Sequence, residues 1–450
     1  MGDADIIRTV RERFRTFSER EAVWWRGQFF SYRDLYERVD AWKGQLQAAG
    51  VQPGTVCSVV GDFSPATMSL FFALMEEACI LVPFTCAVHD IAAFEAIASA
   101  ECRFTFDETD AYVFERFSGV EKKPLLQKMA DEGRPGLVVF SSGSTGEPKG
   151  IVQDCAHVMN KFRTPRKAWR MILFLMMDHF GGFNTFLSAL ANGGVAVCIP
   201  THRPEDVCRA IEAAKADLLP ATPTFLNLLL ASRCDLAYDI TSLRLITYGT
   251  EMMNTTTLKQ LQERFPAVRL KQTYGLSELG VLRSKSEADG SLWLKVGGSE
   301  FETKVVDHIL WIRGESNMAG YLNAPDPFDK DGWFCTGDEV EERDGYLRFV
   351  GRATDIINVG GQKVFPAEVE AVLLEDENVC EAAVFGRPHP LVGQIVAARV
   401  SLLREEPLRD VTVRLRKRCA ARLEKYKIPI KIEIADGEAQ HTERYKKIRG

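Results

Sequence analysis

The sequence lacks any hydrophobic run long enough to cross a membrane. Its longest apolar stretches, such as residues 171–177, are far shorter than the roughly 20 residues that span a bilayer as a helix. The first residues are acidic, and no apolar segment follows them, so they do not resemble a signal peptide. We therefore expect no membrane partner and no targeting segment.

A strong excess of charge of either sign is also lacking. The chain has 56 Lys and Arg against 62 Asp and Glu, a net charge of -6. This balance gives no electrostatic reason to expect nucleic acid or an anionic membrane as a partner. Any negative charge on a ligand must then be met by residues placed locally.

Paired cysteines are the third absence. The eleven cysteines are scattered, with no C-x-x-C pair and no Cys/His spacing typical of a metal site. Their number is odd, so at least one thiol is left unpaired. Reduced thiols fit this usage best, and we expect a cytoplasmic protein.

What the sequence does contain is an alternation of buried strands and helices. At 450 residues the chain exceeds one typical core, which predicts two or three domains. Ser31 and Asp34 form a candidate capping box for a helix that ends near Gly50. The alternation is typical of parallel, doubly wound sheets, which bind ligands at the carboxyl ends of their strands. We expect strands over residues 55–61, 79–84, 195–200, 217–220, 243–248 and 268–272.

A smaller α+β unit is predicted for residues 355–450. Strands are expected over residues 380–385, 395–402 and 431–434, and a basic amphipathic helix over residues 411–423. The sequence thus predicts a large α/β domain followed by a small C-terminal one.

A loop of small and hydroxyl residues follows the apolar run at residues 138–140. Such a loop can approach a polyanion closely, so that its N–H groups, its hydroxyls and Lys149 converge on phosphate oxygens. A Walker A loop is excluded by spacing, because Pro148 stands where its second glycine should be. An ordinary Gly/Ser surface loop is the alternative for such a segment taken alone. The candidate phosphate-binding residues are Ser141, Ser142, Gly143, Ser144, Thr145, Gly146 and Lys149.

Residues 141–150, S-S-G-S-T-G-E-P-K-G, closely resemble the AMP-binding signature of the adenylate-forming superfamily. That superfamily includes acyl-CoA and aryl-CoA synthetases and nonribosomal peptide adenylation domains. The resemblance extends from about Ser31 to Arg449 and includes the further motifs described next. It implies binding of ATP with Mg²⁺, for which Thr145 and Glu278 are the expected ligands.

Asp178-His179-Phe180-Gly181-Gly182 resembles the superfamily's His-x-x-Gly motif. The resemblance implies that His179 borders the pocket for the substrate carboxylate. A single histidine beside an aromatic residue would otherwise more often be structural. Phe180 occupies a position that is acidic in amino-acid-activating relatives, which argues weakly against an amino acid substrate.

Two strand-ending segments resemble the motifs that contact the nucleotide. One contains Gly249, Thr250 and Glu251, expected along the adenine and the substrate. The other, residues 274–278, is Y-G-L-S-E and resembles the superfamily's Tyr-Gly-x-Thr-Glu. Here an aromatic ring suits adenine, a hydroxyl suits the α-phosphate and a carboxylate suits Mg²⁺. The residues assigned to these roles are Tyr274, Gly275, Ser277 and Glu278.

Later motifs resemble the ribose site and the junction with a mobile C-terminal lid. Asp338 is expected to accept hydrogen bonds from both ribose hydroxyls, and Arg352 to contact ribose or phosphate. The resemblance implies a large domain over residues 1–351, a hinge at 352–354 and a lid over 355–450. The usual hinge residue is Asp or Lys, whereas this chain has Thr354. Gly360 and Gly361 are expected to line a pantetheine tunnel, although a plain hairpin turn would use the same glycines.

Residues 442–449, T-E-R-Y-K-K-I-R, resemble the superfamily's last motif and align Lys446 with the lysine needed for adenylation. Tyr445 replaces the usual glycine, and Lys447 is the second choice. On composition alone, a basic terminus would more often be solvated charge.

The resemblance implies that a carboxylic acid, aryl or fatty, is adenylated with release of pyrophosphate and then transferred to a thiol. Coenzyme A is the expected acceptor, since no carrier domain is fused to this chain. Loading of a carrier-protein phosphopantetheine arm is the alternative. Lys446, His179 and Glu278 are the expected catalytic residues. The expected acid pocket is mixed in polarity and comprises Phe183, Asn184, Thr185, Tyr248, Thr250, Leu276 and Leu279.

Overall fold

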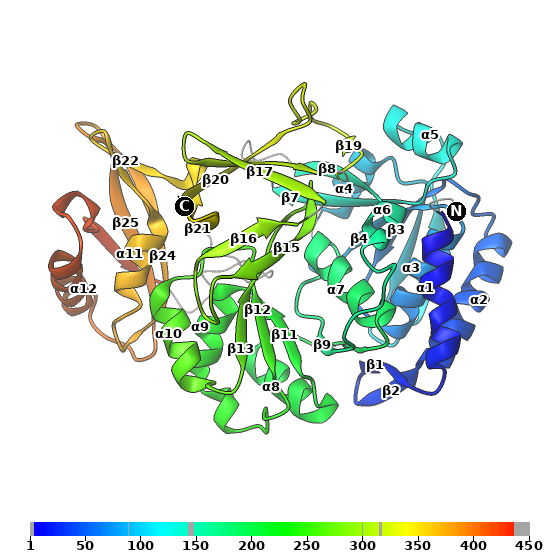
Figure 1. Ribbon diagram of the computed structural model, residues 1–450, viewed down its shortest axis with the longest axis horizontal. Helices are drawn as coiled ribbons and strands as arrows, with labels where there is room; N and C mark the ends of the chain where they lie inside the picture. Colours follow the sequence, from blue (N-terminus) through cyan, green and yellow to red (C-terminus); the bar gives the residue numbers. More distant parts are fainter. Residues whose placement is uncertain (1–3, 89, 143–147, 299, 315–316, 436–450) are drawn as a thin grey trace.

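The computed structural model describes residues 4–88, 90–142, 148–298, 300–314 and 317–435. Three seven-stranded sheets form a large N-terminal body, and a five-stranded sheet lies in a C-terminal domain at one end of the molecule (Figure 1). The large α/β domain with a separate small domain is therefore confirmed.

One sheet has the strand order β19-β8-β7-β4-β3-β5-β6 and carries the strand before the predicted phosphate loop. Its four inner strands β7, β4, β3 and β5 run parallel, while β6, β8 and β19 pair antiparallel. The expected strands at 55–61 and 79–84 are confirmed within one residue at each end. The bounds are β3 Val56–Val60, β4 Ile80–Phe84, β5 Cys102–Phe106, β6 Tyr112–Arg116, β7 Gly136–Ser142, β8 Pro148–Asp154 and β19 Gly320–Tyr321; the helices of this region are α4 Ile91–Ala98 and α5 Pro124–Asp131.

A second sheet, in the order β13-β12-β11-β9-β10-β1-β2, is parallel except for the hairpin β1–β2. The four expected strands after the phosphate loop all belong to it. The bounds are β1 Glu21–Trp25, β2 Gln28–Ser31, β9 Arg170–Ile172, β10 Val195–Val197, β11 Leu218–Ala221, β12 Leu245–Tyr248 and β13 Arg269–Gln272; α8 Pro204–Ala214, α9 Pro223–Ser232, α10 Thr255–Arg264 and the turn η1 Cys234–Leu236 complete the region.

Helices packed between these two sheets build the main core. Side chains of both sheets join one buried cluster with those of the intervening helices. The predicted capping box is present: Ser31 accepts from the Asp34 N–H at 3.1 Å, and Asp34 accepts from the Ser31 N–H at 2.7 Å. These helices are α1 Ala4–Phe17, α2 Tyr32–Ala48, α3 Pro65–Glu76, α6 Cys155–Asn160 and α7 Phe180–Ala191.

The third sheet was not anticipated, because every described pairing in it is antiparallel. Among the described residues no helix separates its strands, and the longest connection, from β18 to β20, contains only β19 of another sheet, so the alternation used to predict parallel sheets is missing here. The strand order is β14-β15-β16-β21-β20-β18-β17. The bounds are β14 Tyr274–Leu276, β15 Gly280–Ser286, β16 Leu294–Gly297, β17 Phe301–Val306, β18 Ile309–Gly314, β20 Phe334–Arg343 and β21 Tyr346–Arg352.

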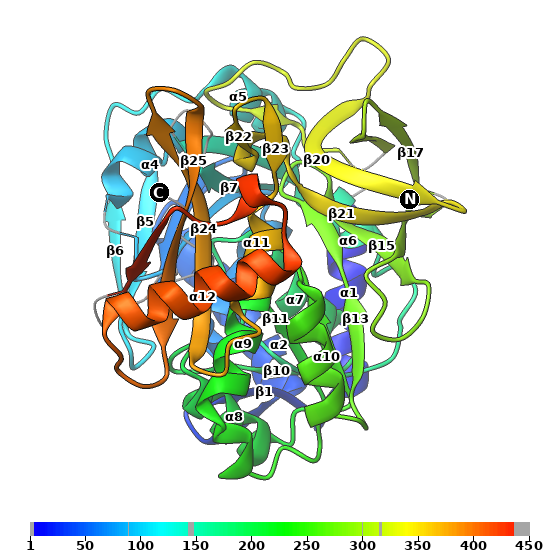
Figure 2. The ribbon, with the colours of Figure 1, turned by 90° about the vertical axis from the view of Figure 1, so that its left-hand side faces the viewer.

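The C-terminal domain follows η2 (Ala353–Asp355) and has its own hydrophobic core. It packs beside α9 and α10 of the body, where the Thr256 hydroxyl donates to the Ala371 carbonyl at 3.3 Å (Figure 2). All three strands expected here are confirmed, and the helix begins three residues earlier than expected. The bounds are β22 Ile357–Val359, β23 Gln362–Val364, α11 Pro366–Leu373, β24 Val379–His389, β25 Gly393–Leu402, α12 Leu408–Arg422, η3 Lys425–Lys427 and β26 Lys431–Ile434.

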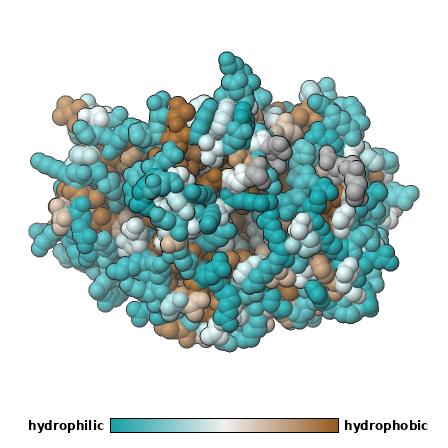
Figure 3. Space-filling view, viewed as in Figure 1, coloured by the Kyte–Doolittle hydropathy of each residue, from teal (hydrophilic) through white to brown (hydrophobic). Residues whose placement is uncertain are grey.

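On the face shown in Figure 3, the surface is mostly hydrophilic, and hydrophobic side chains are scattered over it. Within the described ranges, no helix combines the length and the apolar character needed to span a bilayer.

Tyr32 provides a test of the main core. Its ring is fully buried, and its hydroxyl donates to the Gly194 carbonyl at 2.7 Å, tying the start of α2 to the turn before β10. We expect Tyr32→Phe to lower the free energy of unfolding by about 1–2 kcal/mol, because a buried carbonyl loses its donor. Tyr112→Phe is the matched control, since its hydroxyl bonds Gln45 at the surface. If urea unfolding shows that both variants lose the same free energy of unfolding, this account is wrong.

Candidate active site

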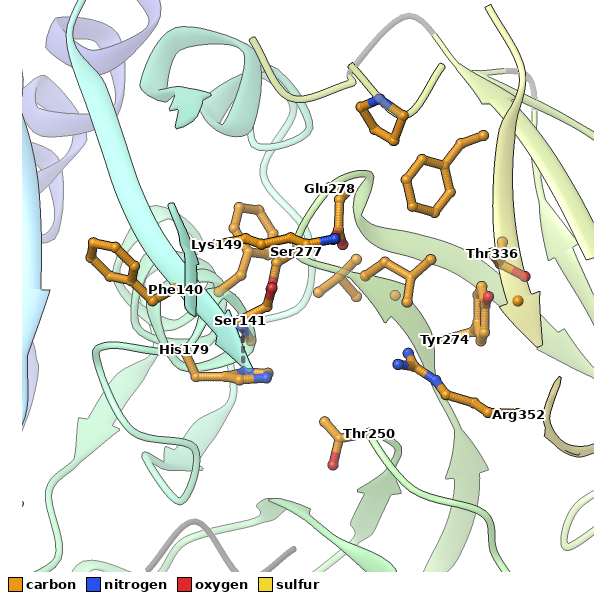
Figure 4. A pocket seen from close by; sticks show the side chains of 18 of the residues that line it. Phe140, Ser141, Lys149, His179, Thr250, Tyr274, Ser277, Glu278, Thr336 and Arg352 are labelled. Carbon is orange, nitrogen blue, oxygen red and sulfur yellow. Dashed lines mark hydrogen bonds between the residues drawn. The ribbon is translucent and has the colours of Figure 1, made fainter. Parts of the chain in front are cut away.

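A cavity of about 480 Å³ opens where the three sheets of the body meet (Figure 4). It lies beyond the carboxyl ends of β7 and β12, as expected for parallel strands. The predicted site residues that it brings together are Ser141, Lys149, His179, Thr250, Tyr274, Gly275, Leu276, Ser277, Glu278 and Arg352. Residues from all three sheets of the body, or from the segments that follow their strands, thus line one cavity.

The two strands that flank the predicted phosphate loop, β7 and β8, meet at this cavity. β7 and β8 pair antiparallel, with Ser141 opposite Lys149 and Ser142 opposite Pro148. Both Ser141 and Lys149 line the cavity. The predicted residues Gly143, Ser144, Thr145 and Gly146 lie outside the described residues, as does Lys446.

His179 caps the N-terminus of α7 with its own ring. Its Nδ1 accepts the Gly181 N–H at 3.0 Å, so the proton of a neutral ring resides on Nε2. Gly182 explains why the motif needs a glycine: a Cβ there would stand 2.0 Å from the Met176 carbonyl oxygen. The close approach of the backbone fixes the turn that places the histidine on the cavity wall.

Tyr274, Asp338 and Arg352 form a hydrogen-bonded set on another wall. The Tyr274 hydroxyl donates to Asp338 at 2.6 Å, and the Arg352 Nε donates to the same carboxylate at 3.1 Å. Phe349 stacks on Tyr274 with ring centroids 4.5 Å apart. Burial raises the pKa of Asp338, against the influence of Arg352, and burial together with Asp338 raises the pKa of Tyr274 well above its usual range. Tyr274 and Arg352 line the cavity, while Asp338 is 7% exposed behind them.

Glu278 and Lys149 provide opposite charges on the third wall. Tyr321 donates its hydroxyl to Glu278 at 2.8 Å, and the Lys149 ammonium lies 5.4 Å from the Tyr321 ring centroid. In Figure 4 the Lys149 side chain extends toward Glu278. The described residues contain no group of three potential metal ligands. A single carboxylate still fits Mg²⁺ that shares its coordination with substrate phosphates, which is the usual mode for this ion.

Several predicted residues do not line this cavity, and each has a definite place in the fold. Phe183 is fully buried against Phe71 and Phe186, and Tyr248 is buried in the core of the second sheet. Glu251 accepts from the Thr224 hydroxyl at 2.7 Å, close to the start of α9. Gly249 packs against Thr273, and Asn184 lies on α7 without reaching the cavity wall.

Gly360 and Gly361 form the two-residue turn of the β22–β23 hairpin. Their φ angles are +59° and +86°, the left-handed conformation that such a turn requires at both positions. They do not contribute to the wall of this cavity. The glycines are thus accounted for by the turn in the arrangement seen here.

The wall also includes residues that had no site role in the sequence interpretation, among them Tyr321 and Thr336. Thr336 lies two residues before Asp338, so proximity to a recognised motif was the signal that could have identified it. Tyr321 contacts two predicted residues at once, Glu278 and Lys149.

A smaller cavity of about 100 Å³ adjoins the first one, and Phe180 and Val281 line both. Leu279, a predicted substrate residue, lines this inner cavity together with Gln153, His157, Val158, Asn160, Lys161, Gly280, Glu300 and Phe301. The two cavities therefore share part of their wall, at Phe180 and Val281.

Comparison with known proteins finds matches over most of the chain. The profile of AMP-binding enzymes matches residues 10–322, and that of the AMP-binding enzyme C-terminal domain matches residues 368–446. A 2-succinylbenzoate–CoA ligase of Listeria monocytogenes serotype 4b (strain F2365) is 25% identical and aligns over 95% of each chain.

Two solved structures have the same fold. The anthranilate CoA ligase AuaEII, crystallised with anthranoyl-AMP, superposes with a TM-score of 0.84 at 19% identity over 99% of this chain and 97% of that one. The amide bond synthetase McbA of Marinactinospora thermotolerans gives 0.78 at 20% identity over 98% and 97%. Proteins named for different activities share this architecture, so the fold does not by itself identify the acyl acceptor.

Gly182 provides a test of how the site is built. We expect Gly182→Ala to destabilise the protein by about 3 kcal/mol, because the new methyl group collides with the Met176 carbonyl and forces the backbone apart. Gly44→Ala is the control: it lies in the exposed interior of α2 with open space around it and should stabilise by about 0.5–1 kcal/mol. If thermal unfolding shows that both alanine variants change the stability in the same direction, this account of the turn is wrong.

Proposed function

The chain belongs to the AMP-binding enzyme family, and from that premise we propose that it activates a carboxylic acid with ATP and passes the acyl group to coenzyme A. A carboxylate oxygen attacks the α-phosphorus, the bond to the bridging oxygen breaks and pyrophosphate leaves. A thiolate then attacks the acyl carbon and AMP leaves. The convergence of His179, Tyr274, Glu278 and Lys149 on one cavity is the observation that supports this reaction most directly.

The nucleotide end of the cavity is formed by Tyr274 and Arg352. We assign the adenosine to this wall, because it offers an aromatic ring, a guanidinium and, just behind them, the Asp338 carboxylate. A carboxylate can accept from both hydroxyls of a ribose. The phosphates would then extend toward Ser141, Lys149 and Glu278.

Joining two anions is the main difficulty of the first step, and the cavity offers positive charge where they meet. Lys149 lies on the wall next to the ends of β7 and β8, and we assign the same purpose to Lys446 of the C-terminal segment. Glu278 would hold Mg²⁺, which neutralises phosphate charge when bound. His179 borders the space left for the acid. Positioning and charge neutralisation suffice, since no side-chain nucleophile is required.

The second step requires the thiol to reach the acyl carbon. Arg352 and Thr354 line the cavity and directly precede the C-terminal domain. Rotation about residues 352–354 would therefore change which part of that domain faces the reacting atoms. We propose the division into residues 1–351 and 355–450 on this basis, with Gly360 and Gly361 reaching the pantetheine arm after the rotation.

An exchange assay tests the reaction class. With a panel of carboxylic acids, the protein should exchange labelled pyrophosphate into ATP only when a suitable acid and Mg²⁺ are present. Product mass then identifies the acceptor, coenzyme A or a carrier-protein phosphopantetheine arm. Release of γ-phosphate without acid-dependent exchange would overturn the proposal. The use of ATP and Mg²⁺ and a cytoplasmic location remain part of this proposal.

Lys446 is the residue expected to matter most for adenylation. We expect Lys446→Ala to slow acid-dependent pyrophosphate exchange by roughly a hundredfold or more, as is typical when one preorganised charge is removed. Lys447→Ala is the neighbouring control and should keep most of the rate. If the effects are reversed, the alignment of the last motif is off by one residue.

Asp338 provides a separate test of the nucleotide wall. Asp338→Asn removes the charge that pairs with Arg352 and one acceptor for a ribose hydroxyl. We expect ATP to bind about tenfold more weakly or worse, measured by calorimetric titration, because charge-assisted hydrogen bonds contribute about 1.5–3 kcal/mol. Asp344→Asn, in the exposed β20–β21 turn, is the matched control. If the wild type and both variants bind ATP with equal affinity, Asp338 is not part of the nucleotide site.

A further inference from the structure

Lys161 directly follows α6 and lines the inner cavity. Its ammonium lies 5.4 Å from the Phe162 ring centroid and 5.8 Å from that of Phe180. Among the described residues, no carboxylate comes within ion-pairing distance of this ammonium. The side chain is thus a half-buried cation between aromatic rings, without a counter-ion on the protein that the structure describes.

The groups around Lys161 do not neutralise it. Glu300 is the acidic residue on the same cavity, but its carboxylate already accepts from Arg283 at 3.2 Å. Arg166, on the segment after α6, adds positive charge, and His157 faces the same space. Burial, with a smaller contribution from Arg166, lowers the pKa of Lys161 to about 8. The protein therefore keeps an uncompensated positive charge in a confined space, which is unfavourable unless an anion joins it.

The inner cavity adjoins the place assigned to the reacting carboxylate. Phe180 follows His179 directly and lines both cavities, and Val281 does the same on the opposite strand β15. A volume of about 100 Å³ accommodates a carboxylate-sized group but not a long alkyl chain. An acid held beside His179 would place its far end here.

We propose that Lys161 binds an anionic group at the far end of the substrate, so that the preferred acid carries a second carboxylate or a comparable anion. This inference rests on the proposed function and specifies its substrate class. Lys161 forms an ion pair with the distal group and fixes the acid lengthwise, which leaves the other carboxylate free to attack ATP. Neutral acids of the same shape leave the cation unpaired and bind less well.

Matched pairs of acids test this directly. We would compare aliphatic α,ω-dicarboxylates of increasing length and the three benzenedicarboxylates with their half-amides, which have nearly the same shape but lack the distal charge. For at least one pair, the wild-type kcat/KM for pyrophosphate exchange should favour the diacid by about tenfold or more, as for a charge-assisted hydrogen bond. Lys161→Met should reduce this ratio about tenfold, whereas Lys161→Arg should retain part of it.

Lys167→Met is the matched control for loss of a lysine from the same segment. Its ammonium lies 3.6 Å from the Trp169 ring centroid, and Lys167 is absent from the wall of the inner cavity. The diacid preference of this variant should equal that of the wild type. Melting temperatures of the three variants report whether each one is folded.

The pH dependence of the preference separates charge from shape. Lys161 is charged below its pKa of about 8 and neutral above it, so the wild-type ratio should decline as pH rises through that value. His157, Arg166 and the Glu300–Arg283 pair also face or flank the site, and Lys161→Arg leaves all of them in place. The arginine variant should therefore keep its preference to higher pH.

The outcomes distinguish this inference from the proposed function. Exchange with neutral acids, combined with a ratio near one for every pair in the wild type, overturns the inference while the proposed function stands. Absence of exchange with every acid overturns the proposed function. In that case, calorimetric titration of the same dicarboxylates without ATP still decides: tighter binding to the wild type than to Lys161→Met supports the anion site, and equal binding overturns it.

Discussion

The buried carboxylate of Asp338 is the constraint on which much of this site depends. It lies on β20, yet it holds Tyr274 of β14 and Arg352 at the end of β21 through two hydrogen bonds. A carboxylate removed from water must keep such partners, since breaking a buried pair typically costs about 3–5 kcal/mol. These two hydrogen bonds thus fix an aromatic wall of the cavity and the last residue of β21, just before η2.

This arrangement links the position of the nucleotide wall to the junction between the domains. Arg352 is bound to the body through Asp338, whereas Thr354, two residues later, already belongs to the short η2 turn. The body thus holds Arg352 directly beside the point proposed for rotation of the C-terminal domain. Both residues line the cavity, so movement at this point would change the wall of the proposed reaction site.

Much of the fold could be predicted from the sequence, because buried strands and capped helices leave local patterns. The Ser31–Asp34 capping box and the strands of the two largely parallel sheets are examples. The antiparallel sheet could not be predicted in the same way. Its strand β15, for instance, is only partly buried, so neither a continuous apolar run nor strict alternation marks it.

The larger cavity gathers many of the residues predicted from motifs but few of those predicted for the acid pocket. His179 caps α7 and faces the cavity, but Phe183, one helical turn later, packs into the core against Phe71 and Phe186. Sequence distance along a helix does not say which face meets the ligand until the packing of its neighbours is known. Phe180 illustrates the same limit, since it proved to line both cavities.

Lys161 shows most clearly what only the folded chain provides. In the sequence it is the first of several basic residues between 161 and 170, most of which are exposed. Its difference from Lys167 arises from residues far along the chain, Leu279, Val281 and Glu300, which enclose the inner cavity. The charge of Lys161 interacts more strongly there than it would in water, and the acid on the same cavity is already paired. The fold that brings Lys149 to the wall of the larger cavity thus also places a second cation, Lys161, beside the smaller one.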